Sequence, residues 1–107
     1  MALVTLEEAK TYLRVDTTDD DTLVSSLLSA AEVLTKDVGR VSDEVWDAVN
    51  ATPAAEDPQN IKDLRPVLKV SELYALAYLY DHREEADHHD LTITMRNMLF
   101  AVREGVL

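Results

Sequence analysis

The sequence predicts an all-α protein, a small bundle of four to five helices in a single domain spanning residues 1–107. Three segments repeat their apolar residues with the period of about 3.6 residues that marks an amphipathic helix. Thr5, Asp19 and Ser42 stand where helix N-caps are expected. Apolar residues make up 47% of the chain and charged residues 29%, which suffices for one hydrophobic core.

The first two helices are predicted from the residues that cap them. Thr5 and Glu8 have the spacing of a capping box, so a helix is expected to begin at Thr5. Acidic residues within 16–21 suit the positive end of a helix dipole, and a second helix is expected from about Asp19. Gly39 stands where that helix would end in a left-handed residue. Its apolar face is predicted to carry Leu23, Leu27, Ala30, Leu34 and Val38, widened by Val24, Leu28 and Ala31.

The next two helices are separated by a loop. Ser42 can cap a short helix that runs to about Val49. Residues 50–60 lack periodicity and contain two prolines, which predicts a loop. Residues 67–80 are rich in Leu, Ala and Tyr and form the strongest helical segment, with Pro66 expected in its first turn.

Two segments carry more apolar surface than one small core needs. Residues 73–80 are apolar or amphipathic on every side, which predicts a helix buried all round, either in the domain or against a neighbouring copy. A last helix, expected over residues 92–104, adds a second apolar stripe near a chain end, and chain ends usually lie at the surface. The contact between copies is therefore expected to use Leu73, Tyr74, Tyr78, Met95, Met98, Leu99 and Val102.

The charge of the chain restricts its partners. With 21 acidic and 10 basic residues, the net charge of −11 repels nucleic acid and anionic membranes. Tyr74, Tyr78 and Tyr80 lie among Leu and Ala, which favours packing over base stacking, because stacking platforms lie among basic residues. Residues 1–13 lack a signal-peptide pattern, and no apolar run approaches the ~20 residues of a membrane span. We expect a protein made in the cytoplasm, with no membrane partner.

No residue pattern predicts a catalytic, cofactor or metal site. In the polar block 82–90 the adjacent His88 and His89 would point about 100° apart on a helix, which favours a solvated turn over zinc ligands. The acidic residues within 16–21 lead directly into a helix, which favours capping over calcium binding. Two glycines are too few for a phosphate-binding loop, and the serines at 25–29 have no histidine nearby in sequence to act as a base. We therefore expect no cofactor and no enzyme activity.

Several blocks of the sequence resemble one protein family. The opening VTLEEAK at residues 4–10, LRVD at 13–16, an acidic turn, and a long helix ending in Gly-Arg at 39–40 resemble the head-tail connectors of long-tailed bacteriophages. Pro66 with Leu-Lys at 68–69, and YDHRE at 80–84, are similar to a second block of that family. Where family members often carry a Pro-Phe-Gly-like turn before the last helix, this chain has LTIT at residues 91–94.

The resemblance implies a structural adaptor that catalyses no reaction. It implies a ring-forming subunit: about a dozen copies docked to the portal protein on one side and to the next tail-proximal connector or stopper protein on the other. Such a ring would lie in the virion at the head-tail junction. It would carry on the order of a hundred negative charges, so DNA would pass through its lumen without specific binding.

A second hypothesis stays open at this point. An acidic chain can also act as a DNA mimic or inhibitor that binds a nucleic-acid-binding partner. That function predicts carboxylates spaced along one exposed face like phosphates, whereas here they cluster at helix starts and turns.

Overall fold

The computed structural model describes residues 2–82 and 89–103, and these residues fold into helices without a strand. The all-α prediction is therefore confirmed. Five helices have eight residues or more, and the sixth is a single turn. Their bounds are α1 Leu6–Leu13, α2 Asp21–Gly39, α3 Asp43–Asn50, α4 Gln59–Asp81, α5 His89–Met98 and α6 Phe100–Arg103.

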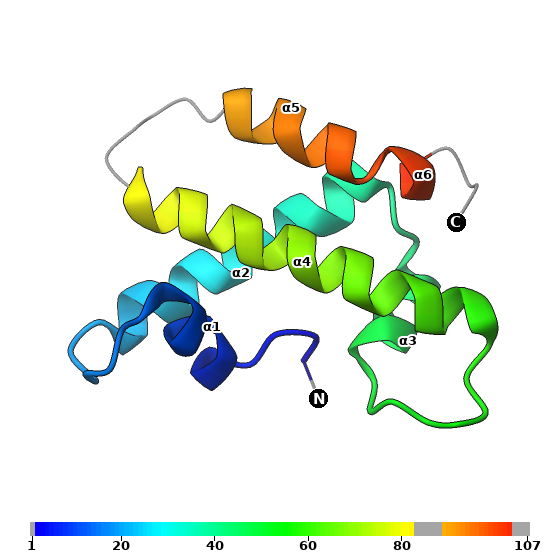
Figure 1. Ribbon diagram of the computed structural model, residues 1–107, viewed down its shortest axis with the longest axis horizontal. Helices are drawn as coiled ribbons and strands as arrows, with labels where there is room; N and C mark the ends of the chain where they lie inside the picture. The colour runs from blue at the N-terminus through cyan, green and yellow to red at the C-terminus, as the bar shows by residue number, and fades with distance from the viewer. Residues whose placement is uncertain (1, 83–88, 104–107) are drawn as a thin grey trace.

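The two longest helices, α2 and α4, cross at the centre of the molecule and make its most extensive helix contact (Figure 1). Helices α1 and α5 each pack on both of them, and α3 packs under the N-terminal half of α4. No helix among the described residues is long and apolar enough to cross a membrane. The crossing supplies much of the core, which includes Val24, Leu28, Ala31 and Val38 from α2, and Leu64, Leu68, Ala75, Leu76 and Leu79 from α4.

Two of the predicted caps are present as hydrogen bonds. The backbone N–H of Glu8 donates to Thr5 Oγ1 at 3.1 Å, and the Thr5 N–H donates to Glu8 Oε1 at 3.2 Å, which completes the capping box. The Val45 N–H donates to Ser42 Oγ at 3.2 Å at the start of α3. Helix α2 begins slightly later than predicted, at Asp21, and the side chain of its N-cap Asp20 makes no capping hydrogen bond.

The end and the buried face of α2 differ from the prediction. The left-handed residue is Arg40, with φ 53°, while Gly39 is the last helical residue. Gly39 is buried against the C-terminal segment, because a Cβ there would lie 3.5 Å from Leu99 Cδ1. Ala30 is exposed, and the buried face of α2 is centred one residue after the predicted stripe. A broad apolar face in the sequence does not reveal which part of it packs against the other helices. The buried residues of α2 are Val24, Leu28, Ala31, Thr35, Val38 and Gly39.

Helix α4 begins earlier than predicted, which places Pro66 inside it. Pro58 is the N-cap and Gln59 the first helical residue, so the loop covers residues 51–58. Apolar residues upstream of Pro66, including the buried Ile61 and Leu64, extend the helix backwards. A proline inside a helix leaves the carbonyl four residues earlier without its usual donor, and the packing of this segment outweighs that cost.

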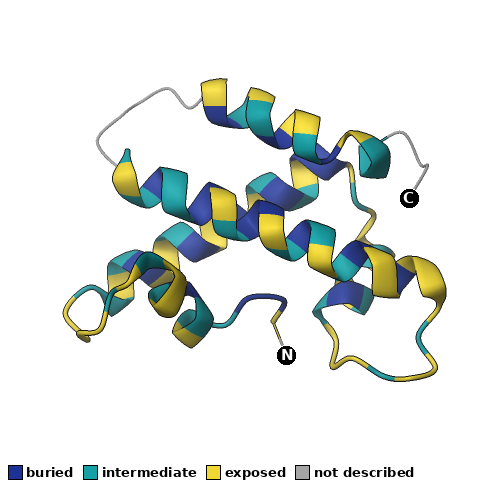
Figure 2. Cartoon of the chain, in the orientation of Figure 1, coloured by how far each residue is buried: buried dark blue, intermediate teal, exposed yellow. Residues whose placement is uncertain are grey.

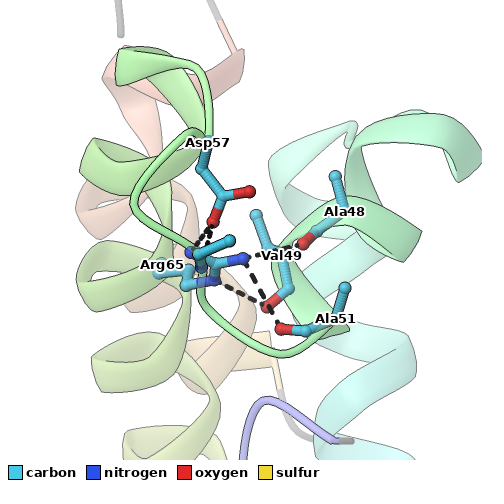
Figure 3. A network of polar contacts seen from close by, with 6 residues as sticks. Ala48, Val49, Ala51, Asp57 and Arg65 are labelled. Carbon is cyan, nitrogen blue, oxygen red and sulfur yellow. Dashed lines mark hydrogen bonds and ion pairs between the residues drawn. The ribbon is translucent and has the colours of Figure 1, made fainter.

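The side chain of Arg65 ties the start of α4 to the end of α3 (Figure 3). Its Nη1 lies 2.7 Å from Asp57 Oδ2, its Nη2 donates to Ala48 O at 3.1 Å, and its Nε donates to Val49 O at 3.3 Å. The last carbonyls of a helix have no intrahelical donor, so the guanidinium caps α3. The Ala54 N–H and the Arg65 guanidinium both hold the pKa of Asp57 below its usual value.

Replacing Arg65 by Met is expected to destabilise the fold. The substitution keeps an apolar stem but leaves helix-end carbonyls without donors, at a cost on the order of 2 kcal/mol in the free energy of unfolding. Urea unfolding followed by circular dichroism measures the change. Lys62→Met, at an exposed position of the same helix, is the matched control. Equal unfolding midpoints for the two variants would show that the Arg65 contacts contribute nothing to stability.

The C-terminal helix is broken where the sequence predicts continuity. It starts at His89 and is interrupted at Leu99, so residues 91–94 lie inside α5 and α6 forms a separate turn. Residues 104–107 lie outside the described part of the chain. Residues 73–80 are not all buried within the single chain, because Tyr74 is 39% exposed, so their burial against a neighbouring copy stays a prediction. The neighbouring helices cover only part of α4.

Candidate functional site

The uncovered side of α4 carries an apolar stripe. Pro66, Val70 and Tyr74 follow one another at four-residue intervals, so they lie on one face of the helix. Val70 is 58% exposed, although valine usually lies inside, and Tyr74 is 39% exposed. We call these three residues the α4 stripe. Apolar side chains exposed along one helix face make the α4 stripe a candidate contact surface for another molecule.

Two adjoining hollows that share Tyr12 run between α1 and the C-terminal half of α4. The first has a volume of about 440 Å³ and the second about 230 Å³. Their apolar lining includes Tyr12, Leu73, Tyr74, Ala77 and Tyr78, and Glu7, Glu8 and Asp81 contribute carboxylates. We call the two hollows together the aromatic groove.

Contacts with neighbouring residues hold the C-terminal part of the aromatic groove. The Tyr78 and His82 rings stack with centroids 4.1 Å apart and an angle of 16° between their planes. His82 Nδ1 also lies 3.0 Å from the Tyr78 carbonyl oxygen. At the other end, Glu8 forms an ion pair with Lys69 of α4. Burial and partners limit the rotamers of these side chains, which lowers the entropy lost on binding.

A third hollow lies on the other flank of the α4 stripe. It has a volume of about 430 Å³ and is lined by Pro66, Val67, Val70 and Met98. We call it the aliphatic hollow. It is formed where α5 packs beside the N-terminal half of α4, and none of the described residues that line it is charged.

The outer side of α5 and α6 carries a different combination of side chains. Ile93 is 43% and Phe100 61% exposed, and Arg96 and Asn97 lie between them, also exposed. The spacing of three and four residues places Ile93, Arg96 and Asn97 on one side of α5, and Phe100 follows at the start of α6. Figure 2 shows exposed residues along the edge of α5 that faces away from α4. We call Ile93, Arg96, Asn97 and Phe100 the α5 ridge.

A comparison with protein families identifies the class of this helical chain. Residues 3–106 match the family model of the phage gp6-like head-tail connector protein. The chain belongs to this family. The resemblance inferred from the sequence blocks is thereby confirmed, and the protein is a phage head-tail connector, a structural protein of the virion. Comparisons with curated proteins and with solved structures give no match.

Of the seven residues expected to form the contact between connector copies, five are accessible. Leu73, Tyr78, Met98 and Val102 are half-buried, and Tyr74 is exposed. The structure places Met95 and Leu99 in the core instead, both with 0% exposure. They face inward because α5 packs on α2 and α4, and Gly39 lets Leu99 approach α2 closely.

Several exposed apolar residues of the connector were not predicted from the sequence. Tyr12 lies off the helix face formed by Leu6, Ala9 and Leu13, and this offset was the sequence signal that Tyr12 is exposed. Val70 precedes Tyr74 by four residues, a spacing that also predicts a shared face. Ile93 and Phe100 are off the stripe through residues 95–102, and this too was readable from helical spacing.

The candidate metal ligands lie partly outside the described residues, which omit residues 83–88 and with them His88 of the polar block. The described residues hold no group of three or more His, Cys, Asp or Glu side chains arranged for a metal ion. In the acidic segment 16–21, Asp21 Oδ1 lies 2.7 Å from Lys10 Nζ, which ties α1 to α2. The absence of a metal site remains a prediction.

Glu72 is a buried carboxyl on α4 that lines neither the aromatic groove nor the aliphatic hollow. Neither of its carboxyl oxygens has a hydrogen-bond partner among the described residues. Burial, reinforced by the carboxylates of Glu32 and Glu8, raises the pKa of Glu72 to about 8, and the nearby Lys69 opposes the shift. Helical spacing was the available signal for this burial, because Glu72 lies four residues after Leu68 and four residues before Leu76, both of which are buried.

Stability of the connector is expected to fall as the pH rises from about 4.5 to about 8. In this range Glu72 keeps its proton in the folded state and loses it in the unfolded state. The unfolded state therefore binds fewer protons, and a rise in pH stabilises it relative to the folded state. Glu72→Gln should flatten the slope and stabilise the protein by a few kcal/mol at pH 8. Thermal unfolding from pH 5 to pH 9 measures both effects, with Glu44→Gln as the exposed control. Parallel profiles for wild type and Glu72→Gln would refute the assignment.

Proposed function

We propose that this connector forms a ring of about a dozen copies at the head-tail junction, docked to the portal protein on one side and to the next connector or stopper protein on the other. The observation that carries the proposal is the uncovered α4 stripe, with the aromatic groove and the aliphatic hollow beside it. A single chain leaves this surface in water. A neighbouring copy would bury it and gain roughly 25 cal/mol for each Å² of apolar area covered.

The chemistry of the surfaces supports a closed ring. The aromatic groove and the α5 ridge are unlike, and contacts between unlike patches are head-to-tail, so they close into a ring when the rotation between copies divides a full turn. The described chain measures 39 × 29 × 19 Å. Even with the shortest dimension along the circumference, about a dozen copies enclose an opening wider than a DNA duplex.

The net charge fits a passage for DNA. Each copy carries −11, so a ring presents a strongly negative field that disfavours adhesion of the phosphate backbone. The same charge opposes association of free copies. The DNA-mimic alternative gains no support from the family, and the described structure places acidic pairs in the first turns of α1 and α3, where they complement helix dipoles.

Assembly is expected to depend on the α4 stripe and on salt. Raising the ionic strength should strengthen association, because the Debye length shortens to about 8 Å near physiological salt. Val70→Asp combined with Tyr74→Asp should leave folded protein that no longer assembles. Sedimentation velocity and negative-stain imaging, with and without portal protein, measure this. Val33→Asp, an exposed position on α2, is the control. A wild-type chain that stays monomeric in every condition, including with portal, would overturn the proposal.

The purified connector is expected not to bind double-stranded DNA. Its 10 basic residues are outnumbered by 21 acidic ones, so few phosphates can be neutralised. A mobility-shift assay at low salt and micromolar protein is the measurement, because low salt maximises any electrostatic binding. A retarded band that disappears at moderate salt would contradict this expectation. It would show that the connector has a locally basic surface despite its negative net charge.

A further inference from the structure

Resting on the proposed ring, we propose that the aromatic groove of one copy receives the α5 ridge of the next copy. The occupant of the groove is thus a second copy of this chain. The groove supplies tyrosine rings and carboxylates, and the ridge supplies Ile93, Phe100 and a guanidinium. Tyrosine and arginine are the residue types most enriched among the side chains that dominate binding energy in protein interfaces.

The charges of the two surfaces are complementary. Glu7 and Asp81 are exposed and line opposite ends of the aromatic groove. Arg96 is exposed between Ile93 and Phe100, and it forms no ion pair with another described residue. Placing the ridge in the groove would bring the Arg96 guanidinium to a carboxylate edge. Groove against groove would oppose carboxylates, whereas the ridge carries Arg96 together with the exposed Asp90 one turn before Ile93 and is the less acidic surface, so charge favours the unlike pair.

The placement of the two surfaces suits a contact that repeats around a ring. Helix α1, with the aromatic groove, lies along one flank of α4, and α5, with the ridge, lies along the other (Figure 1). One copy can therefore offer its groove to one neighbour and its ridge to the other at the same time. This is the requirement for a head-to-tail interface.

Cross-linking tests the pairing directly, because the natural chain has no cysteine. The double variant Tyr74→Cys with Phe100→Cys should give, under mild oxidation, a ladder of covalent species that ends at the ring. Each single variant should stay monomeric under denaturing conditions, because a head-to-tail contact brings no residue against itself. Val33→Cys with Phe100→Cys is the matched control and should give no ladder. Rings without a ladder, or a disulfide dimer from Tyr74→Cys alone, would overturn the pairing and leave the ring intact.

Charge reversal gives an independent readout. Arg96→Glu should weaken assembly about ten-fold or more, because it opposes like charges at every contact. The pair Glu7→Lys and Asp81→Lys should do the same, and all three changes together should restore assembly. Lys62→Glu, with the same charge change at an exposed position outside both surfaces, is the control. Equal effects of Arg96→Glu and Lys62→Glu, or no rescue, would overturn the pairing. Failure of wild type to assemble with or without portal would instead overturn the ring.

Discussion

The contact between α2 and α4 is the interaction on which the rest of the structure depends. Both helices place small residues on their buried faces, Ala31 on α2 and Ala75 on α4, alongside larger Leu and Val side chains. Small side chains let helix axes approach closely, and the larger ones fill the grooves on either side. Helices α1 and α5 then pack on both members of the pair, and α3 on α4. None of these shorter helices has more than ten residues, so tertiary packing supplies most of their stability.

The length of α4 has a consequence for function. It has 23 residues, whereas α1, α3 and α5 have 8, 8 and 10, so its neighbours cover it only in part. A large part of the α4 stripe remains in water in the isolated chain. The apolar residues at these positions are only partly covered within one copy. They fit a connector whose partners cover α4 in the assembled state.

Local signals in the sequence predicted the helices well, but they did not predict which residues pack against other helices. Thr5 and Ser42 correctly predicted where α1 and α3 begin, because a helix cap is a hydrogen bond between residues that are close in sequence. Pro66 led to a helix start that was predicted too late, because proline suits the first turn of a helix. Only the packing of the upstream segment shows that α4 starts at Gln59. Helical period defined the stripe containing Met95 and Leu99, but it could not tell which neighbour would cover that stripe. The Arg65 contacts join α4 to backbone carbonyls 14 to 17 residues away, which no spacing rule reveals.

The exposed apolar surface and the acidic charge act against each other in assembly. Apolar burial favours association at any salt concentration, whereas repulsion between copies of charge −11 grows with every copy added to a ring. In the proposed ring, a contact between Arg96 and the carboxylates of the aromatic groove offsets part of that repulsion where it is strongest, at the interface. A docking protein that presents basic residues would offset more of it. The proposed ring would therefore be weakest among free copies at low salt and strongest on a complementary template such as the portal.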